Sequence, residues 1–532
     1  MPGLRKLRCL LMLFFALALL RGKMEVASGS GIYDWLQFNG DPQHSGNNTQ
    51  EIRINRYNVA ALRVQYQVAL NAWVDSTPAF LHGVVTAQGV KDLLFMDTAK
   101  DGLIAVDAQT GALAWSQPLG PGDCTMNNDG ATPCWTTSSV AVDPNKQFVY
   151  SYGLDGYVHK YQVGDGVEIK DEHWPEVTTL KGFDEKGSAN LSIATAKNGI
   201  SYLYVAHSGY PSDGGDYQGH VTAINLSSGA QQVFNVLCSD QIVHFVSDRP
   251  GYPGNPDCQE KQAGVWARSG VVYDPDVDRI FFATGNGYFD GNLYWGNSIL
   301  ALHPDGSGSS GKPVDSYTPV DWPVLRQADM DLGSTPPVIL PPLPGSSYAH
   351  LAVQGGKDST LRFVNLDDLS GKGGPGNTGG EIGAPLQLYS VSEEQPEDEL
   401  HTAPAVWTNP EDGSVWIFVV TDSHAVGLKI LVQNGIPEFS RQWEVAQGGS
   451  SPLVANGVLF YAGSTSQSTG GIWALNPTTG EVLWSANLPG AIHWESPIVA
   501  NGVVYMVDYG SNLTAFVPPP LDKHVYLPLI AR

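Results

Sequence analysis

The stretch GIWALNPTTGEVLWS occupies residues 471–485, and residues 102–116 read GLIAVDAQTGALAWS. In each copy an alternating apolar segment predicts a half-buried strand, a turn follows, and a second alternating segment ends next to a tryptophan. The turn NPTTG combines a proline, which fixes φ, with a glycine at a position that needs a positive φ. The repeated element is therefore a pair of strands joined by a tight turn.

Residues 450–464 read SSPLVANGVLFYAGS and supply two further strands, separated at an Asn-Gly dipeptide that is typical of hairpin turns. One unit therefore has four antiparallel strands. The same order of strands and turns recurs along the chain, in units at 76–119, 136–166, 189–229, 266–308, 333–371, 401–445, 450–485 and 495–518.

The last unit contains three strands, whereas LRVQYQVAL at residues 62–70 stands before the first unit without a unit of its own. Pairing the two closes a ring and protects the last sheet edge. The sequence therefore predicts an all-β fold, an eight-bladed β-propeller of four-stranded antiparallel blades, whose last blade is closed by the N-terminal strand. We expect Trp115 and Trp484, which end the repeated stretch, to pack between neighbouring blades.

The composition supports this fold and excludes some classes of partner. The 532 residues include 60 glycines and 36 prolines, which suit many short strands joined by tight turns. The formal net charge is −24. Nucleic acids and anionic membranes attract basic surfaces, so we expect neither as a partner. We expect a monomer that binds a protein, a glycan or a small molecule at the channel mouth.

Residues 1–27 have a basic start and an apolar stretch that is shorter than a membrane-spanning helix. This pattern predicts a secretory signal peptide, with an uncleaved anchor as the alternative. The protein is then secreted, periplasmic or part of the cell envelope, with no membrane span after cleavage. We expect the propeller to occupy residues 28–518 and a Pro-rich tail to occupy residues 519–532.

Four cysteines remain after cleavage: Cys124, Cys134, Cys238 and Cys258. In an exported protein, four cysteines predict two disulfides with three possible pairings. The local pairs, 124 with 134 and 238 with 258, are favoured here. The spacing of cysteine and histidine does not match a zinc site.

The alternation of strands predicts where functional residues gather. The start of the first strand of each blade and the loop between its second and third strands lie at the same channel mouth. Acids, amides and aromatic rings of this rim suit a planar ligand and an oxygen-liking cation, although loop Asp and Asn residues also commonly cap turns. The rim residues are Asp75, Trp135, Asn190, Asp213, Asp216, Trp266, Asn286, Asp331, Lys357, Asp358, His401, His424, Trp494, Glu495 and Asp508.

The blade motif ALNPTTGEVLW and the opening segment WLQFNGDPQHSGN at 35–47 resemble the quinoprotein family of eight-bladed propellers. One branch of that family contains dehydrogenases that bind pyrroloquinoline quinone (PQQ) and Ca²⁺ and oxidise alcohols or sugars. The other contains binding scaffolds without cofactor, such as the propeller lipoprotein of outer-membrane assembly.

The resemblance implies roles for particular residues. Residues 265–287, VWARSGVVYDPDVDRIFFATGNG, are similar to the segment in which Trp266 would form the floor under the quinone and Asn286 would bind calcium. VQGGKDSTLRFVNLD resembles the segment with the basic residue that holds the quinone oxygens, here Lys357. DMDLGS lies near the family's catalytic aspartate, which makes Asp331 the candidate base, with Asp329 behind it.

Two departures from the family pattern affect the predicted site. The calcium-binding glutamate that should precede QGHVTAI is absent, and Asp213 and Asp216 are the acids present. The adjacent cysteines found in many alcohol-oxidising members are also missing, and no CxxCH haem motif occurs. The sequence therefore favours a binding scaffold with a degenerate quinone-type site, with a PQQ- and Ca²⁺-dependent dehydrogenase as the alternative.

Overall fold

The computed structural model describes residues 32–99, 102–118, 135–209, 213–241, 258–390 and 397–519. The predicted signal peptide, Cys124, Cys134 and nearly all of the predicted tail lie outside these residues. Nearly all regular structure in the described residues is β-strand. The helices are short: η1 (Val59–Ala61), α2 (Trp322–Gln327) and η2 (Leu332–Ser334).

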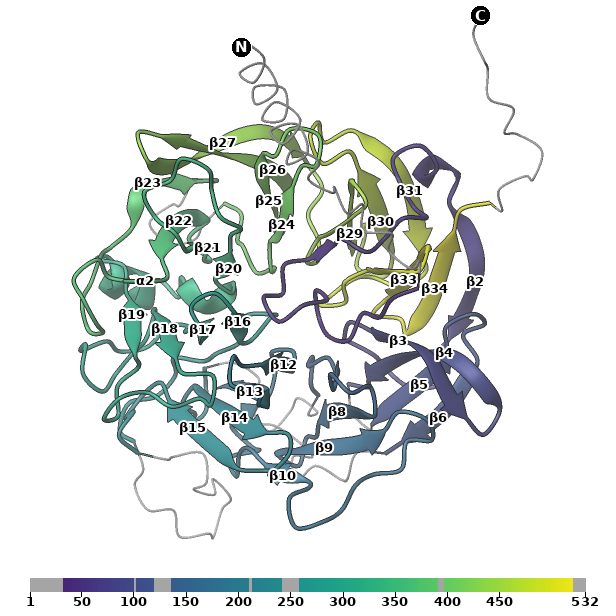
Figure 1. Ribbon diagram of the computed structural model, residues 1–532, viewed down its shortest axis with the longest axis horizontal. Coiled ribbons are helices and arrows are strands. Elements are labelled where there is room, and N and C mark those ends of the chain that lie inside the picture. The colour runs from purple at the N-terminus through teal and green to yellow at the C-terminus, as the bar shows by residue number, and fades with distance from the viewer. Residues whose placement is uncertain are drawn as a thin grey trace, which may run out of the picture.

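Eight antiparallel sheets surround a central channel in the order of the sequence (Figure 1). Each sheet begins with its innermost strand and ends with its outermost one. The first four blades are β3 (Ala79–Thr86), β4 (Gly89–Asp97), β5 (Leu103–Asp107) and β6 (Leu113–Gln117); β7 (Ala141–Val142), β8 (Phe148–Tyr152), β9 (Tyr157–Gln162) and β10 (Glu176–Val177); β12 (Ser192–Thr195), β13 (Ser201–Gly209), β14 (His220–Asn225) and β15 (Gln231–Asn235), with β11 (Glu185–Lys186) also on β13; and β16 (Val272–Asp274), β17 (Arg279–Ala283), β18 (Ile299–Leu302) and β19 (Asp315–Tyr317).

The remaining blades follow the same plan. They are β20 (Val338–Ile339), β21 (Leu351–Gln354), β22 (Thr360–Asn365) and β23 (Ile382–Gln387); β24 (Ala405–Thr408), β25 (Val415–Val420), β26 (Ala425–Gln433) and β27 (Ile436–Val445); β28 (Leu453–Ala455), β29 (Val458–Ser464), β30 (Gly470–Leu475) and β31 (Val482–Leu488); and β32 (Ile498–Ala500), β33 (Val503–Val507) and β34 (Asn512–Val517), completed by β2 (Arg63–Ala69).

Closure of the ring follows the prediction. The N-terminal strand β2 pairs antiparallel with the C-terminal strand β34, in a register that places Arg63 opposite Val517 and Ala69 opposite Asn512. The first and last parts of the propeller are thereby joined by backbone hydrogen bonds, and no sheet edge is left open between them. The predicted eight-bladed propeller is confirmed.

The tryptophans of the repeat join neighbouring blades, as predicted. The indole Nε1 of Trp115 donates to the carbonyl of Val163 in the next blade over 3.0 Å, and that of Trp484 donates to the carbonyl of Leu62 over 3.2 Å. Trp443 makes the same contact with Pro477 over 2.8 Å. Gly480 has a φ of +72°, and a Cβ there would lie 2.7 Å from the Trp443 ring. The turn glycine is thus required both by its backbone and by the tryptophan against it.

The opening segment, residues 35–48, closes the far end of the channel. It runs across the centre of the ring (Figure 1) and bonds to the innermost strands of seven blades in turn. Its partners in blade order are Phe80, Val142, Ile193, Tyr273, Val406, Val454 and Val499. In each blade the contacted residue follows the predicted rim residue along the chain, as Phe80 follows Asp75 and Val406 follows His401, so the segment lies on the inner side of the predicted mouth.

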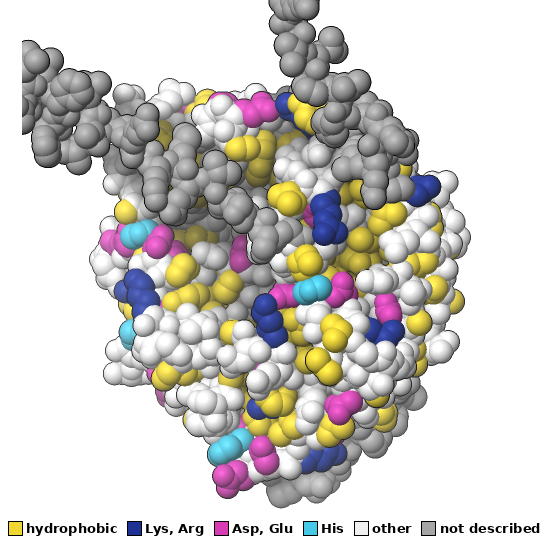
Figure 2. Space-filling view, turned by 45° about the vertical axis from the view of Figure 1, so that its right-hand side comes forward, with side chains coloured by type: hydrophobic (Ala, Val, Ile, Leu, Met, Phe, Trp, Pro, Cys, Tyr) yellow, Lys and Arg dark blue, Asp and Glu magenta, His cyan; other side chains and the backbone are white. Residues whose placement is uncertain are grey.

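Cys238 and Cys258 form a disulfide, which confirms that pair. The second predicted pair lies outside the described residues. Among the described residues, none of the helices has the length and apolar character needed to cross a bilayer. On the face shown in Figure 2, basic side chains lie singly among acidic and hydrophobic ones.

Candidate functional site

A cavity of about 360 Å³ opens at the predicted mouth of the channel. Its walls come from the starts of inner strands and from the loops between second and third strands, as strand alternation requires. Eight of the residues singled out in the sequence line it. Five of them, Asp213, Trp266, Asn286, Asp331 and Lys357, come from blades three, four and five and are brought together by the ring; the others are Trp135, Asp329 and Trp494.

Asp216 lies apart from this group. Its carboxylate is half-exposed and faces Lys261 at 3.7 Å and Lys181 at 4.0 Å, and it does not line the cavity. Asp358, also expected at the rim, is buried in an ion pair with Arg362 and caps the backbone N–H of Thr360. For Asp358, the turn-capping role is the one that the structure shows.

Asp331 lies at the bottom of the group with both carboxylate oxygens engaged. Oδ1 accepts a hydrogen bond from the backbone N–H of Asn286, and Oδ2 lies 2.8 Å from Nζ of Lys357. Burial raises the pKa of Asp331 above its ordinary value and outweighs the opposing charge and hydrogen bond of Lys357. The short contact with Lys357 makes Asp331 one half of a buried pair of opposite charges.

Lys357 lies between two aspartates and the ring of Trp266. Its Nζ contacts Asp331 and lies 3.4 Å from Asp329, and it stands 5.4 Å from the centroid of the Trp266 ring. Burial lowers the pKa of Lys357, but the neighbouring carboxylates outweigh it, so the net pKa is raised and the ammonium stays charged. A fixed positive charge thus lies beside a flat indole face.

Carboxylate oxygens of two aspartates lie around the side-chain amide of Asn286. Its Nδ2 donates to Asp329 Oδ1 over 2.6 Å and to Asp213 Oδ2 over 3.1 Å, so two carboxylates meet at one amide group. The hydroxyl of Tyr217 donates to the other oxygen of Asp213. Carboxylate and amide oxygens are the ligands that Ca²⁺ prefers, so this cluster is where the cavity could hold a hard cation.

Gly285 allows Asp331 and Trp266 to approach each other. A Cβ built on Gly285 would lie 2.7 Å from Asp331 Oδ1 and 3.2 Å from the Trp266 indole nitrogen. The ATGNG stretch therefore has two roles. The side chain of Asn286 bonds to two aspartates, and Gly285 leaves room for the Asp331 carboxylate and the Trp266 indole in the same cavity wall.

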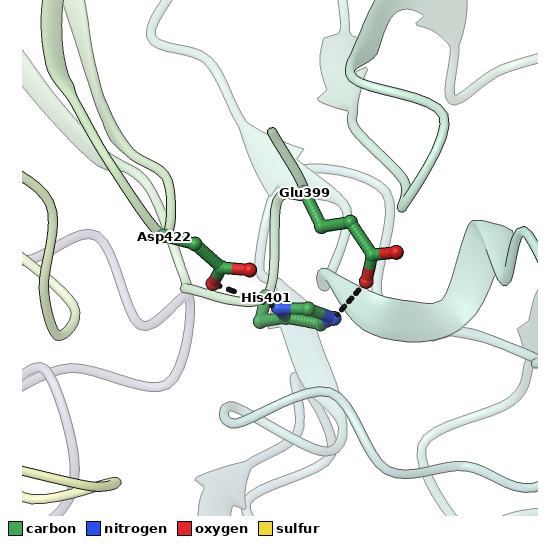
Figure 3. Close-up of side chains that lie close together, drawn as sticks. All are labelled: Glu399, His401 and Asp422. Atoms are coloured by element: carbon green, nitrogen blue, oxygen red, sulfur yellow. Dashed lines mark hydrogen bonds and ion pairs between the residues drawn. The ribbon is translucent and has the colours of Figure 1, made fainter. Parts of the chain in front are cut away.

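A second cavity, of about 470 Å³, adjoins the first and shares Trp266, Arg268, Lys357, His493 and Trp494 with it. Its outer wall carries Glu399, His401 and Asp422 (Figure 3). His401 Nε2 lies 2.9 Å from Glu399, and Nδ1 lies 3.1 Å from Asp422.

The three side chains offer a set of possible metal ligands, but their arrangement is that of an ion triad. The two carboxylates lie on opposite sides of the imidazole, each facing a different ring nitrogen (Figure 3). A single ion bound to one nitrogen would leave the other carboxylate on the far side of the ring. Burial lowers the pKa of His401, but the hydrogen bonds to Asp422 and Glu399 outweigh it and raise the pKa to about 9. The ring is therefore an imidazolium at neutral pH.

Comparisons with known proteins support the fold. The model of the family described as outer membrane protein assembly factor BamB matches residues 409–518. A europium-containing methanol dehydrogenase has a similar structure, with a TM-score of 0.60, 16% identity and 89% of each chain covered. Quinohemoprotein alcohol dehydrogenases from Pseudomonas putida and Comamonas testosteroni each have a TM-score of 0.62 and 14% identity, and cover 92% of this chain and 81% of theirs. The chain has the quinoprotein propeller fold. A comparison with curated protein sequences finds no match.

Two basic residues of this propeller mouth, Arg268 and Lys186, are not among those that the sequence predicts for the site. Arg268 is buried at the centre of the mouth, where its guanidinium donates to the carbonyl of Thr137 over 3.0 Å and lies 5.5 Å from the Trp494 ring centroid. Burial lowers the pKa of Arg268 to about 10, against the raising effect of Asp75 and Glu495. Arg268 follows Trp266 by two residues but lies in a turn before β16, where no strand pattern marks it.

Lys186 is the second cation, and nothing in its local sequence marks it. Its Nζ donates to the carbonyl of Trp135 over 2.8 Å and lies 4.8 Å from that ring. Burial lowers the pKa of Lys186 to about 7, with Asp75 acting in the opposite direction. Arg268, Lys186, Lys357 and His401 are thus basic side chains that line the two cavities of a protein that is strongly acidic overall.

Proposed function

We propose that the protein is an exported oxidoreductase that binds a planar, polyanionic quinone of the PQQ type together with a divalent cation such as Ca²⁺, and oxidises the CH–OH group of an alcohol or sugar. The observation that carries this proposal is the convergence of Trp266, Asn286, Asp331 and Lys357 in one cavity of a channel closed at its other end. The disulfide between Cys238 and Cys258 is in keeping with an oxidising compartment.

The cations of the mouth fit a polyanionic ligand. Arg268 is buried, and its Nε has no hydrogen-bond partner among the described residues. A buried donor without a partner costs free energy, and a ligand carboxylate would satisfy it. Lys186 and Lys357 line the same cavity, so several carboxylates of one ligand can each meet a positive charge.

The oxygen cluster fits a hard cation. Asp213, Asp329 and Asp331 all lie around Asn286, and an amide can turn to present its oxygen in place of its nitrogen. Asp213 and Asp329 thereby supply the carboxylates in the absence of the glutamate that the family pattern leads one to expect. A cation at this place would also relieve the repulsion between acids that now share a single lysine.

When bound, a quinone of this class accepts a hydride from carbon. The chain's own residues would hold and polarise it. The Trp266 ring offers a flat stacking surface, and Lys357 would stabilise negative charge that develops on quinone oxygens. The family resemblance implies a base at Asp331, and the contacts of this carboxylate with Lys357 and Asn286 fix its position in the cavity.

A second candidate is a scaffold that binds a protein or glycan at the same mouth without catalysis. The match of residues 409–518 to the family model of an outer-membrane assembly factor favours it. The missing adjacent cysteines also favour it, because no disulfide can then cover the second face of a quinone in the way many alcohol-oxidising quinoproteins use.

The test is a titration of the purified protein with PQQ in the presence of Ca²⁺, followed by the quinone absorbance and by dye reduction with a panel of alcohols and sugars. We expect saturable binding that Lys357→Met weakens by about 10- to 100-fold, since a charge-assisted hydrogen bond contributes about 1.5–3 kcal/mol. Lys91→Met is the matched control, because Lys91 pairs with Asp107 away from the cavity. An unshifted absorbance at saturating quinone contradicts the proposal and leaves the scaffold.

A further inference from the structure

His493 lies where the two cavities meet, and its two ring nitrogens have different surroundings. Nδ1 lies 2.7 Å from Asp75 Oδ2. Nε2 has no hydrogen-bond partner among the described residues, and the side chain is 43% exposed and lines both cavities. Asp75 is fully buried. A half-exposed imidazole with a buried carboxylate behind it is the arrangement that presents one ring nitrogen to a ligand.

The backbone around His493 fixes the ring. The N–H of Trp494 donates to Asp75 Oδ1 over 3.3 Å, and the N–H of His493 donates to Glu495 Oε2 over 2.8 Å. The imidazole packs against the Trp494 ring at 5.1 Å and edge-on against Tyr509 at 5.4 Å. The ring therefore has one orientation, with Nδ1 on the carboxylate and Nε2 on the cavity side.

Several titratable groups surround this pair. Glu495 is fully buried, and burial raises its pKa well above the ordinary value, with Asp75 and Asp508 adding to the shift. The buried cations Arg268 and Lys186 both interact with Asp75. Tyr509 is a further titratable neighbour, and its pKa is raised by burial and then by Asp75 and Glu495.

We propose that His493, oriented by Asp75, is a proton-accepting catalytic residue of the cavity, with Nε2 as the accepting atom. This inference rests on the proposed function and adds to it a base that the family resemblance does not supply. Asp331 has both oxygens occupied, by Lys357 and by the Asn286 backbone, whereas Nε2 of His493 is free to accept.

In this reaction the O–H bond of the substrate would break, its proton would go to Nε2 of His493, and its electron pair would become the second bond of the product carbonyl. The C–H hydrogen would leave with its electron pair as a hydride, for which a bound oxidised quinone would be the acceptor. Asp75 accepts the Nδ1–H throughout and stabilises the imidazolium that forms.

The first test needs neither cofactor nor substrate. In neutral His493 the proton must be on Nδ1, the minor tautomer of free imidazole, because Nδ1 faces a carboxylate. Two-bond ¹H–¹⁵N correlation spectra of ¹⁵N-histidine-labelled protein distinguish the tautomers, with His493→Gln assigning the signal. We expect the Nδ1–H form in the wild type and its loss in Asp75→Asn. An Nε2–H tautomer in the wild-type protein overturns the proposal.

The second test uses the protein loaded with PQQ and Ca²⁺. We expect His493→Gln to lower kcat by about 10²-fold or more with quinone affinity unchanged. His82→Gln is the matched control, since His82 pairs with Asp92 at 2.6 Å outside both cavities. Full activity in His493→Gln refutes His493 as the base. A wild-type protein that binds no quinone refutes the proposed function instead, and the tautomer spectra then decide by themselves whether Asp75 orients His493.

Discussion

The ion triad of the second cavity should make the free energy of unfolding depend on pH. The pKa of His401 rises from an ordinary value of 6.5 to about 9, because Asp422 and Glu399 outweigh the effect of burial. A difference of about 2.5 pH units corresponds to about 3 kcal/mol, at about 1.4 kcal/mol per unit. The side chain is 19% exposed, so little of this is lost to solvent screening.

The sign of the pH dependence follows from proton binding. The folded protein holds the His401 proton more tightly than the unfolded chain does, so the contribution to stability is complete below pH 6.5 and is lost as pH rises through about 9. Replacement by a neutral residue should therefore cost about 3 kcal/mol at pH 6 and much less at pH 10.

Urea denaturation of wild type and His401→Gln, compared at each pH, measures this difference and cancels groups that titrate in both proteins. The His401 pKa itself can be followed by NMR, and Glu399→Gln should lower it. An equal loss of stability at pH 6 and pH 10, or a His401 pKa near 6.5, refutes the ion triad. Tight binding of Zn²⁺ that requires all three side chains refutes it as well.

Three further predictions concern other parts of the molecule. Gly285→Ala should lower quinone affinity at least 10-fold in the absorbance titration with the fold intact by circular dichroism, because its Cβ would displace Asp331 and the Trp266 indole; unchanged affinity contradicts the shared wall. Trp443→Ala should cost about 3–5 kcal/mol of unfolding free energy in urea, since it removes a buried indole between two blades, and a loss below about 1 kcal/mol argues against the blade contact. Cys238→Ser should lower stability by about 3 kcal/mol, as expected for a disulfide between residues 20 positions apart; equal thermal unfolding of variant and wild type contradicts this.

The repeat made the fold predictable, because the turn and the terminal tryptophan of the repeated unit make the same kind of contact wherever they recur. Trp115 meets the turn of the next blade and Trp484 meets the closing strand through the same indole hydrogen bond, so one interpreted unit explains the others. Closure by residues 62–70 followed from counting strands in the last unit. The parallel contact of β1 (Asn47–Asn48) with β28 was not predicted, since two residues carry no strand pattern.

The sequence predicted the site residues that lie at the ends of blade strands. It did not predict the contacts between residues that are far apart in the chain. Trp266, Asn286 and Lys357 stand at positions that alternation directs to the mouth. His493 and Asp75 are 418 residues apart, and no local pattern shows that one orients the other. The position of Asp216 was also beyond the sequence, because a turn of the same loop takes Asp213 into the cavity and Asp216 to Lys261.

The closure of the far end is a further feature that sequence patterns could not provide. The segment 35–48 reads as an irregular, polar stretch, yet it bonds to the inner strands of seven blades, five through its backbone and two through the side chains of Gln37 and Asn48. The guanidinium carbon of Arg268 lies 6.0 Å from the ring centroid of Phe38 in this segment, so the segment also packs against the buried cation. Only the ring, once assembled, offers so many strand ends to one segment.

A crystal structure of the protein grown with PQQ and Ca²⁺ tests the central claim most directly. We expect quinone density against the Trp266 ring, with its carboxylates near Arg268 and Lys186 and a cation among Asn286, Asp213 and Asp329. An empty cavity at saturating quinone, or quinone bound only outside it, contradicts the account.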